Sequence, residues 1–249
     1  MQVANPTIVL SSTGSDSAHY LRQACDAFTF LPRLVFSVIV EIVSVIFFAI
    51  IGVFTNGERF NPSSLDPKKP TILFINGLCH NPTAALFLRM RLGSKVNIYS
   101  YSYASYRFWH KRNCSIADYT RSIQAKVDKL KKETNGPVKV VAHSMGGLIA
   151  LGLKDVKEMT LIGTPARGSW AARICPIFRV IKEMQPGSTY VETIRQSAEE
   201  RIRSGDLQVR VHSSSMDALV RPHSTRIKGA EEISYNYLGH VGLLLTAGL

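Results

Sequence analysis

The chain has 249 residues and carries 30 Lys and Arg against 18 Asp and Glu, which gives a formal net charge of +12. Its length suits one α/β domain of medium size, and its 45% content of hydrophobic residues argues against a disordered chain. The basic residues are scattered and form no stripe interleaved with aromatics, so no nucleic-acid partner is expected, whereas the positive balance fits a solvated basic surface or an anionic membrane.

The first predicted unit is an N-terminal segment over residues 1–55. Within it, residues 34–54 form an apolar run of 21 residues whose only charged side chain is that of Glu41. A run of this length can cross the hydrocarbon core of a bilayer, so we expect a hydrophobic helix that associates the protein with a membrane. The alternative is a helix buried against the rest of the protein. Basic residues stand on both sides of the run, so the side of the membrane stays open.

A linker follows over residues 56–70, and a catalytic domain is expected over residues 71–249. Continuous apolar runs predict strands at 71–76, 96–103, 138–141, 159–162, 207–212 and 233–237. Helical spacing predicts helices at 83–92, 115–132 and 189–203, and a further helix directly after the third strand. This alternation predicts an α/β fold with a mostly parallel sheet of about six strands and helices on both faces.

The sequence Ala-His-Ser-Met-Gly at 142–146 stands between the third strand and the helix that follows it. A serine on a sharp strand-to-helix turn with small flanking residues is typical of a nucleophile elbow. Gly146 fills one of the small positions, and Ala142 stands where glycine is more usual. We therefore predict Ser144 as a nucleophile. The backbone N–H of Met145, at the start of the helix, is predicted to stabilise an oxyanion.

A serine nucleophile needs a base, and the base needs an orienting acid. His240 follows the last predicted strand and is the favoured base, with His223 as the alternative. Asp217 follows the fifth strand at its carboxyl end, where active sites of parallel sheets assemble, and is the favoured acid. Its competitors Asp206, Glu231 and Glu232 precede strands and so stand at the other edge of the sheet.

A second oxyanion donor is expected in the loop after the first strand, where Gly77 allows close approach to a substrate. The backbone N–H of Leu78 is the candidate. Cys79 lies in the same loop but has no elbow context, so a structural role is expected for it. The four cysteines match no zinc or CxxC spacing, and no metal or organic cofactor is expected.

These motifs together resemble those of the α/β-hydrolase superfamily, and within it small bacterial lipases and esterases with an A-x-S-x-G serine box. The segments that carry the resemblance are ILFINGL at 72–78, AHSMGG at 142–147, GTPARGS at 163–169, PGS at 186–188, DALV at 217–220 and GHVGLL at 239–244. The resemblance runs from residue 71 to the C-terminus. The hydrophobic N-terminal helix is not part of the compact lipase pattern.

The resemblance implies a serine hydrolase that cleaves carboxylic esters through an acyl-enzyme, with Ser144, Asp217 and His240 as its triad. The apolar run and the basic balance favour lipid acyl esters as substrates. Two other hypotheses stay open. An acyltransferase would use the same triad and pass the acyl group to an alcohol or thiol, and an inactive membrane-tethered protein would keep only the scaffold. The sequence does not predict the oligomeric state.

Overall fold

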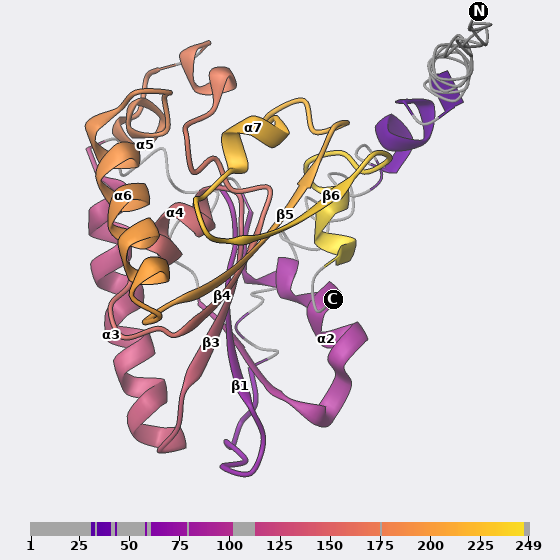
Figure 1. Cartoon of the computed structure of the whole chain (residues 1–249). Coiled ribbons are helices and arrows are strands. Elements are labelled where there is room, and N and C mark those ends of the chain that lie inside the picture. The colour runs from indigo at the N-terminus through magenta and orange to yellow at the C-terminus, as the bar shows by residue number, and fades with distance from the viewer. Residues whose placement is uncertain are drawn as a thin grey trace, which may run out of the picture.

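The computed structural model describes residues 31–32, 34–40, 43, 58, 61–78, 80–101, 113–174 and 176–246 (Figure 1). The strands are β1 (Thr71–Ile75), β2 (Asn97–Ser100), β3 (Val138–His143), β4 (Glu158–Ile162), β5 (Gln208–Ser214) and β6 (Glu231–Tyr235). The α-helices are α2 (Leu86–Leu92), α3 (Ile116–Thr134), α4 (Met145–Leu151), α5 (Arg179–Glu183), α6 (Thr189–Arg203) and α7 (Pro222–Thr225). Short 3-10 helices are η2 (Pro82–Ala85), η3 (Gly93–Lys95), η5 (Trp170–Arg173) and η6 (Gly242–Thr246).

The strands form one six-stranded sheet in the order β2-β1-β3-β4-β5-β6, and all five pairings are parallel. The predicted parallel sheet of about six strands is therefore confirmed. The chain reverses its direction of travel across the sheet between β1 and β3, which is where α/β proteins commonly bind ligands. Because all strands are parallel, the loops that follow β1, β3, β4, β5 and β6 emerge at the same edge of the sheet.

Helices cover both faces of the sheet (Figure 1). On one face, α3, α4 and α6 enclose the larger core, to which α3 contributes the buried side chains Ile116, Tyr119, Ile123, Val127 and Leu130. On the other face, α2 and the yellow C-terminal helix η6 enclose a smaller core around Phe74, Val141 and Ile162. A capping box between Ser115 and Asp118 begins α3, and Ser188 caps α6.

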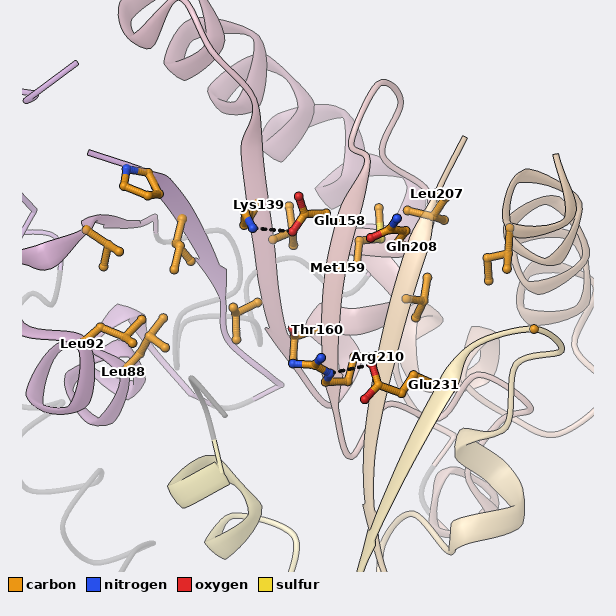
Figure 2. Close-up of a pocket in the computed structure, with 18 of the residues that line it drawn as sticks. Leu88, Leu92, Lys139, Glu158, Met159, Thr160, Leu207, Gln208, Arg210 and Glu231 are labelled. Atoms are coloured by element: carbon orange, nitrogen blue, oxygen red, sulfur yellow. Dashed lines mark hydrogen bonds and ion pairs between the residues drawn. The ribbon is translucent and has the colours of Figure 1, made fainter. Parts of the chain in front are cut away.

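Among the elements that the structure describes, α2 and η6 cover only part of the second face. An open depression of about 660 Å³ lies over the amino-terminal halves of β3 to β6, beside Leu88 and Leu92 of α2 (Figure 2). Figure 2 shows its floor crossed by two ion pairs between neighbouring strands, Lys139 with Glu158 and Arg210 with Glu231. These half-exposed charges lie at the opposite edge of the sheet from the loops that follow the strands.

Most of the N-terminal segment 1–55 lies outside the described residues. The described part of the predicted hydrophobic helix, residues 34–40 and 43, is helical, and the rest of 34–54 lies outside. Among the residues that the structure describes, no helix combines the length and the apolar character needed to cross a bilayer. The described part of the predicted linker runs along the edge strand β2, where the Asn61 side chain accepts from the Ser100 N–H at 2.9 Å and donates to the Ser100 carbonyl at 2.9 Å.

Candidate active site

Ser144 occupies a sharp turn between β3 and α4, with φ 54° and ψ −128°. Positive φ is uncommon outside glycine, and such strained conformations persist where the surrounding structure enforces them. The Ser144 N–H donates to the Ile162 carbonyl oxygen at 2.9 Å, which ties the turn to the end of β4. The strained geometry of a nucleophile elbow is therefore present at the predicted serine.

The two glycines after Ser144 allow the start of α4 to pack closely against the chain where it leaves β1 and where it leaves β4. A Cβ at Gly146 would lie 2.4 Å from the carbonyl oxygen of Asn76, the first residue after β1. A Cβ at Gly147 would lie 1.8 Å from the side-chain oxygen of Thr164, which follows β4. The Gly-Gly pair is thus required by the close approach of α4 to these loops, and this contact sets the position of the serine.

Three side chains from three different loops meet at this turn. His240 Nδ1 lies 2.7 Å from Asp217 Oδ2, and His240 Nε2 lies 2.9 Å from Ser144 Oγ. A carboxylate can only accept a hydrogen bond, so Nδ1 carries the ring proton and Nε2 presents its lone pair to the serine hydroxyl. The structure thus joins the predicted nucleophile, base and acid in one hydrogen-bonded chain.

Asp217 is held firmly in this chain. Its carboxyl group is fully buried, and its second oxygen, Oδ1, accepts from the backbone N–H groups of Leu219 and Val220 at 2.9 and 2.8 Å. Gly163, at φ 55°, lies beneath the pair, where a Cβ would come within 3.3 Å of both Asp217 Oδ2 and the His240 ring. Both carboxylate oxygens are therefore occupied by hydrogen bonds, which fixes the direction of the imidazole.

The competing residues lie elsewhere. His223 is exposed on α7, and Asp206 lies beside α6, hydrogen-bonded to Ser204. Glu231 and Glu232 begin β6, where they pair with Arg210 and Arg226. Of the candidates for base and acid, the structure therefore brings His240 and Asp217 to Ser144.

The loop after β1 lies against the serine. A Cβ at Gly77 would lie 2.9 Å from Ser144 Cβ, so only glycine allows this approach. The Asn76 side-chain amide donates to the carbonyl oxygens of Gly77 and His80 at 3.0 and 2.9 Å and holds the loop in shape. Leu78 follows in this loop, and Met145 is the first residue of α4, so both predicted oxyanion donors belong to elements that meet at Ser144. Cys79 lies outside the described residues.

A stack of histidine rings beside His240 was not predicted from the sequence. The His143 ring lies 4.8 Å from the His240 ring and 5.5 Å from the His80 ring. Since a carbonyl oxygen can only accept, His143 Nε2 donates to the His240 carbonyl at 3.0 Å. Alternation along β3 places His143 on the same strand face as the buried Val141, so its burial could have been predicted, although its partner could not.

Burial disfavours the charged form of the two stacked histidines. Burial, together with the nearby charge that His240 can carry, lowers the pKa of His143 well below its ordinary value and that of His80 to about 4. Among these three rings, His240 is the one whose Nδ1 meets a carboxylate, that of Asp217. This arrangement has the geometry for proton transfer from a serine hydroxyl to an imidazole, the first step of nucleophilic acyl transfer.

In residues 31–246, apart from the gaps given above, no group of three or more His, Cys, Asp or Glu side chains is placed to hold a metal ion. Cys114, at the start of α3, is a free thiol.

No family model and no curated protein matches the sequence. Solved structures do match. A lipase of Bacillus licheniformis in its mature form is similar with a TM-score of 0.60 at 14% identity, over 74% of this chain and 90% of that one.

Two further lipolytic enzymes have the same architecture. Lipase B of Aspergillus fumigatus is similar with a TM-score of 0.57 at 14% identity, over 74% of this chain and 52% of that one. Phospholipase PlaB of Legionella pneumophila is similar with a TM-score of 0.52 at 16% identity, over 64% of this chain and 44% of that one. Identities this low show the fold alone, and the fold of this chain is that of the α/β-hydrolases.

Proposed function

We propose that this protein is a serine hydrolase of carboxylic esters. The observation that carries the proposal is the continuous chain from Ser144 Oγ through His240 to Asp217, with contacts of 2.9 and 2.7 Å. Its position supports the same reading, because Ser144 occupies the strained turn between β3 and α4 of an α/β-hydrolase fold. Fold alone would not carry the proposal, since one fold supports many functions.

In the proposed reaction, Ser144 Oγ attacks the ester carbonyl carbon while His240 Nε2 takes the hydroxyl proton. The tetrahedral intermediate collapses, the ester C–O bond breaks, and His240 returns the proton to the departing alkoxide. A water molecule, deprotonated by His240, then attacks the acyl-enzyme, and the carboxylic acid leaves with Ser144 restored. Asp217 holds the Nδ1–H tautomer throughout and stabilises the imidazolium.

The negative oxygen of each tetrahedral intermediate needs donors that are already oriented. We assign this role to the backbone N–H groups of Leu78 and Met145. In the part of the chain that the structure describes, neither N–H donates a hydrogen bond to another group, so both are available to a substrate oxygen. The positive end of α4 adds to the stabilisation at Met145.

The substrates we propose are lipid acyl esters, and the site of action is a membrane surface. The similar solved structures include lipases and a phospholipase. The apolar run at 34–54 and the net charge of +12 also favour a membrane with anionic lipids. In this proposal the segment 1–55 associates with the membrane, and residues 56–70 connect it to the catalytic domain, 71–249.

The test is hydrolysis of p-nitrophenyl esters of increasing acyl length by the full chain and by Ser144→Ala. We expect the parent to release p-nitrophenol and the Ser144→Ala variant to fall to the uncatalysed background while keeping its melting temperature. The preferred acyl length separates an esterase from a lipase. A fluorophosphonate probe, which reacts with activated serines, should label the parent and leave Ser144→Ala unlabelled.

Ser204→Ala is the matched control, because Ser204 is an exposed serine at the end of α6, far along the chain from the elbow. It should keep full activity and full labelling. Ester hydrolysis retained by a folded Ser144→Ala variant would contradict the proposed nucleophile.

A further inference from the structure

A set of exposed side chains beside the acid loop combines apolar and positively charged groups. We name it the docking rim, and it comprises Trp170, Arg173, Ile174, Ile177, Leu219 and Arg221. Its apolar members are far more exposed than large hydrophobic residues usually are when they serve a core: Trp170 43%, Ile174 71%, Ile177 59% and Leu219 47%. Exposed apolar side chains that gather in one place often mark a surface that binds a protein or a membrane.

Two segments that are distant in sequence are hydrogen-bonded to each other within the rim. Trp170 Nε1 donates to the Ala218 carbonyl at 3.1 Å, and Ser169 Oγ donates to the Leu219 carbonyl at 2.6 Å. The guanidinium of Arg221 lies 5.9 Å from the centre of the Trp170 ring. Arg173 is three residues after Trp170 in the 3-10 helix η5, and side chains at that spacing lie on the same side.

The rim carries positive charge without partners. Within the described ranges, neither Arg173 nor Arg221 forms an ion pair. The nearest acids in sequence are engaged elsewhere: Asp217 is buried against His240, and Glu183 pairs with Arg179 and accepts from the Ile116 N–H. The free charges of the rim are therefore cationic and lie among exposed apolar side chains.

The rim is rigidly connected to the candidate active site. Leu219 and Arg221 belong to the loop that carries Asp217, and the Leu219 N–H itself donates to the Asp217 carboxylate. In Figure 1 the segment that joins β4 to α5 rises above the same end of the sheet as α7, and the Arg167 N–H bonds the Ser224 carbonyl there at 2.8 Å. The rim thus lies at the edge where Ser144, Asp217 and His240 emerge.

We propose that the docking rim binds an anionic lipid surface and holds the active-site edge of the domain against it. Exposed tryptophan and aliphatic side chains suit the interfacial region of a bilayer, and arginines beside them suit anionic headgroups. The proposal deepens the proposed function by naming the surface at which esters would be met. It concerns residues of the catalytic domain and is separate from the role proposed for 34–54.

The experiment uses the full chain with Ser144→Ala, so that no lipid is consumed. Trp109→Phe is added, which leaves Trp170 as the one tryptophan, since the sequence holds two. Phosphatidylcholine vesicles with and without phosphatidylglycerol are added, and binding is followed by sedimentation and by Trp170 emission. We expect a blue shift of Trp170 emission and stronger sedimentation with phosphatidylglycerol, and we expect high salt to weaken both.

Rim variants separate this surface from the N-terminal segment, which could bind vesicles by itself. Arg173→Glu combined with Ile174→Ser and Ile177→Ser should lower partitioning onto phosphatidylglycerol vesicles about tenfold or more. Lys129→Glu combined with Met90→Ser is the matched control, because both residues are exposed on helices outside the rim, and it should partition like the parent. Melting temperatures establish that each variant is folded.

Two outcomes would overturn the proposal. One is Trp170 emission that does not change when the protein sediments with vesicles. The other is a rim variant that partitions onto vesicles as the control does. That result is also expected if the rim binds an acidic protein instead of lipid. Hydrolysis of soluble esters tests the proposed function separately. Vesicle binding that depends on the rim without ester hydrolysis would contradict the proposed function alone. Ester hydrolysis without rim-dependent binding would contradict the docking proposal alone.

Discussion

His143, the residue directly before the candidate nucleophile, donates a hydrogen bond from its Nε2 to the backbone carbonyl of His240, the candidate base, at 3.0 Å. Ser144 itself contacts the other end of His240, through Nε2 of the imidazole. Two consecutive residues of one elbow therefore hold His240 at its backbone and at its side chain. This double contact makes His143 a positioning residue for His240.

We expect His143→Leu to lower kcat by up to about 100-fold with a smaller change in KM, because small displacements of a catalytic group are costly in rate. The loss has a physical cause, since leucine leaves the buried His240 carbonyl without its donor. His143→Gln keeps an N–H donor at a similar reach and should recover much of the rate. Steady-state kinetics on a soluble ester measures both variants, and a folded His143→Leu variant with an unchanged kcat would contradict the positioning role.

Asp217→Asn should lower kcat on the order of 10⁴-fold while binding of the substrate changes little. An asparagine amide can donate a hydrogen bond to Nδ1 of His240, which favours the tautomer with the ring proton on Nε2. In that tautomer Nε2 has no lone pair to accept the serine proton. Asp206→Asn is the matched control, because its carboxylate is exposed and bonds only locally, to Ser204. Both variants can be measured with the same soluble ester, and equal activity of the two would argue against Asp217 as the acid.

Gly146→Ala should destabilise the fold by about 1–3 kcal/mol or more, as overpacking usually does. The added Cβ would lie 2.4 and 2.5 Å from the carbonyl oxygens of Asn76 and Ile75, which are backbone atoms and cannot rotate away. At Gly136, by contrast, the nearest atom to a Cβ is 3.6 Å away. Gly136→Ala should therefore change stability by no more than about 0.5 kcal/mol. Urea unfolding compares the two, and equal midpoints would show that α4 is free to move away from β1.

Stability should fall as the solution becomes acidic. Burial lowers the pKa of His212 from 6.5 to about 4, and it lowers the pKa of His143 as well. Between these values the unfolded chain binds protons at both positions and the folded chain does not, so unfolding is favoured by about 1.4 kcal/mol per pH unit for each histidine. The stabilisation is complete above pH 6.5 and is lost as the pH falls toward about 4.

Urea unfolding across that range measures the slope. His212→Asn should reduce it, because asparagine does not titrate while its amide can still hydrogen-bond near the Tyr235 hydroxyl, the present partner of His212 Nδ1 at 3.1 Å. An equal slope in the parent and in His212→Asn would assign the acid sensitivity to other groups.

The sheet could be predicted from the sequence because its strands are buried on both faces and so read as continuous apolar runs. The last strand shows the limit of that signal. It was expected at 233–237, whereas β6 spans Glu231–Tyr235. This edge strand begins with two charged residues, Glu231 and Glu232. The Glu231 carboxylate pairs with Arg210 on the neighbouring strand β5, which allows a charged residue at this position of the sheet. A local pattern of apolar residues does not show which residues will pair across two strands, so the start of β6 could not be predicted in this way.

The order of Ser144, Asp217 and His240 in the chain, and the position of each after a strand, were enough to predict them as one site. The reason is that the loops after parallel strands all lie at the same edge of the sheet. The structure places the three side chains within hydrogen-bonding distance, and their roles stay predictions. The contact of His143 with His240 was not predicted from the sequence. That contact depends on how the loop after β6 folds back over β3, which no local pattern encodes.

The candidate base stands 96 residues after the candidate nucleophile, and it reaches the nucleophile only after β6 has joined the edge of the sheet. A growing chain therefore contains the candidate nucleophile well before it contains the group proposed to activate it. Under the proposed function, ester hydrolysis would begin only when the chain has been made up to His240 and the loop after β6 is in place.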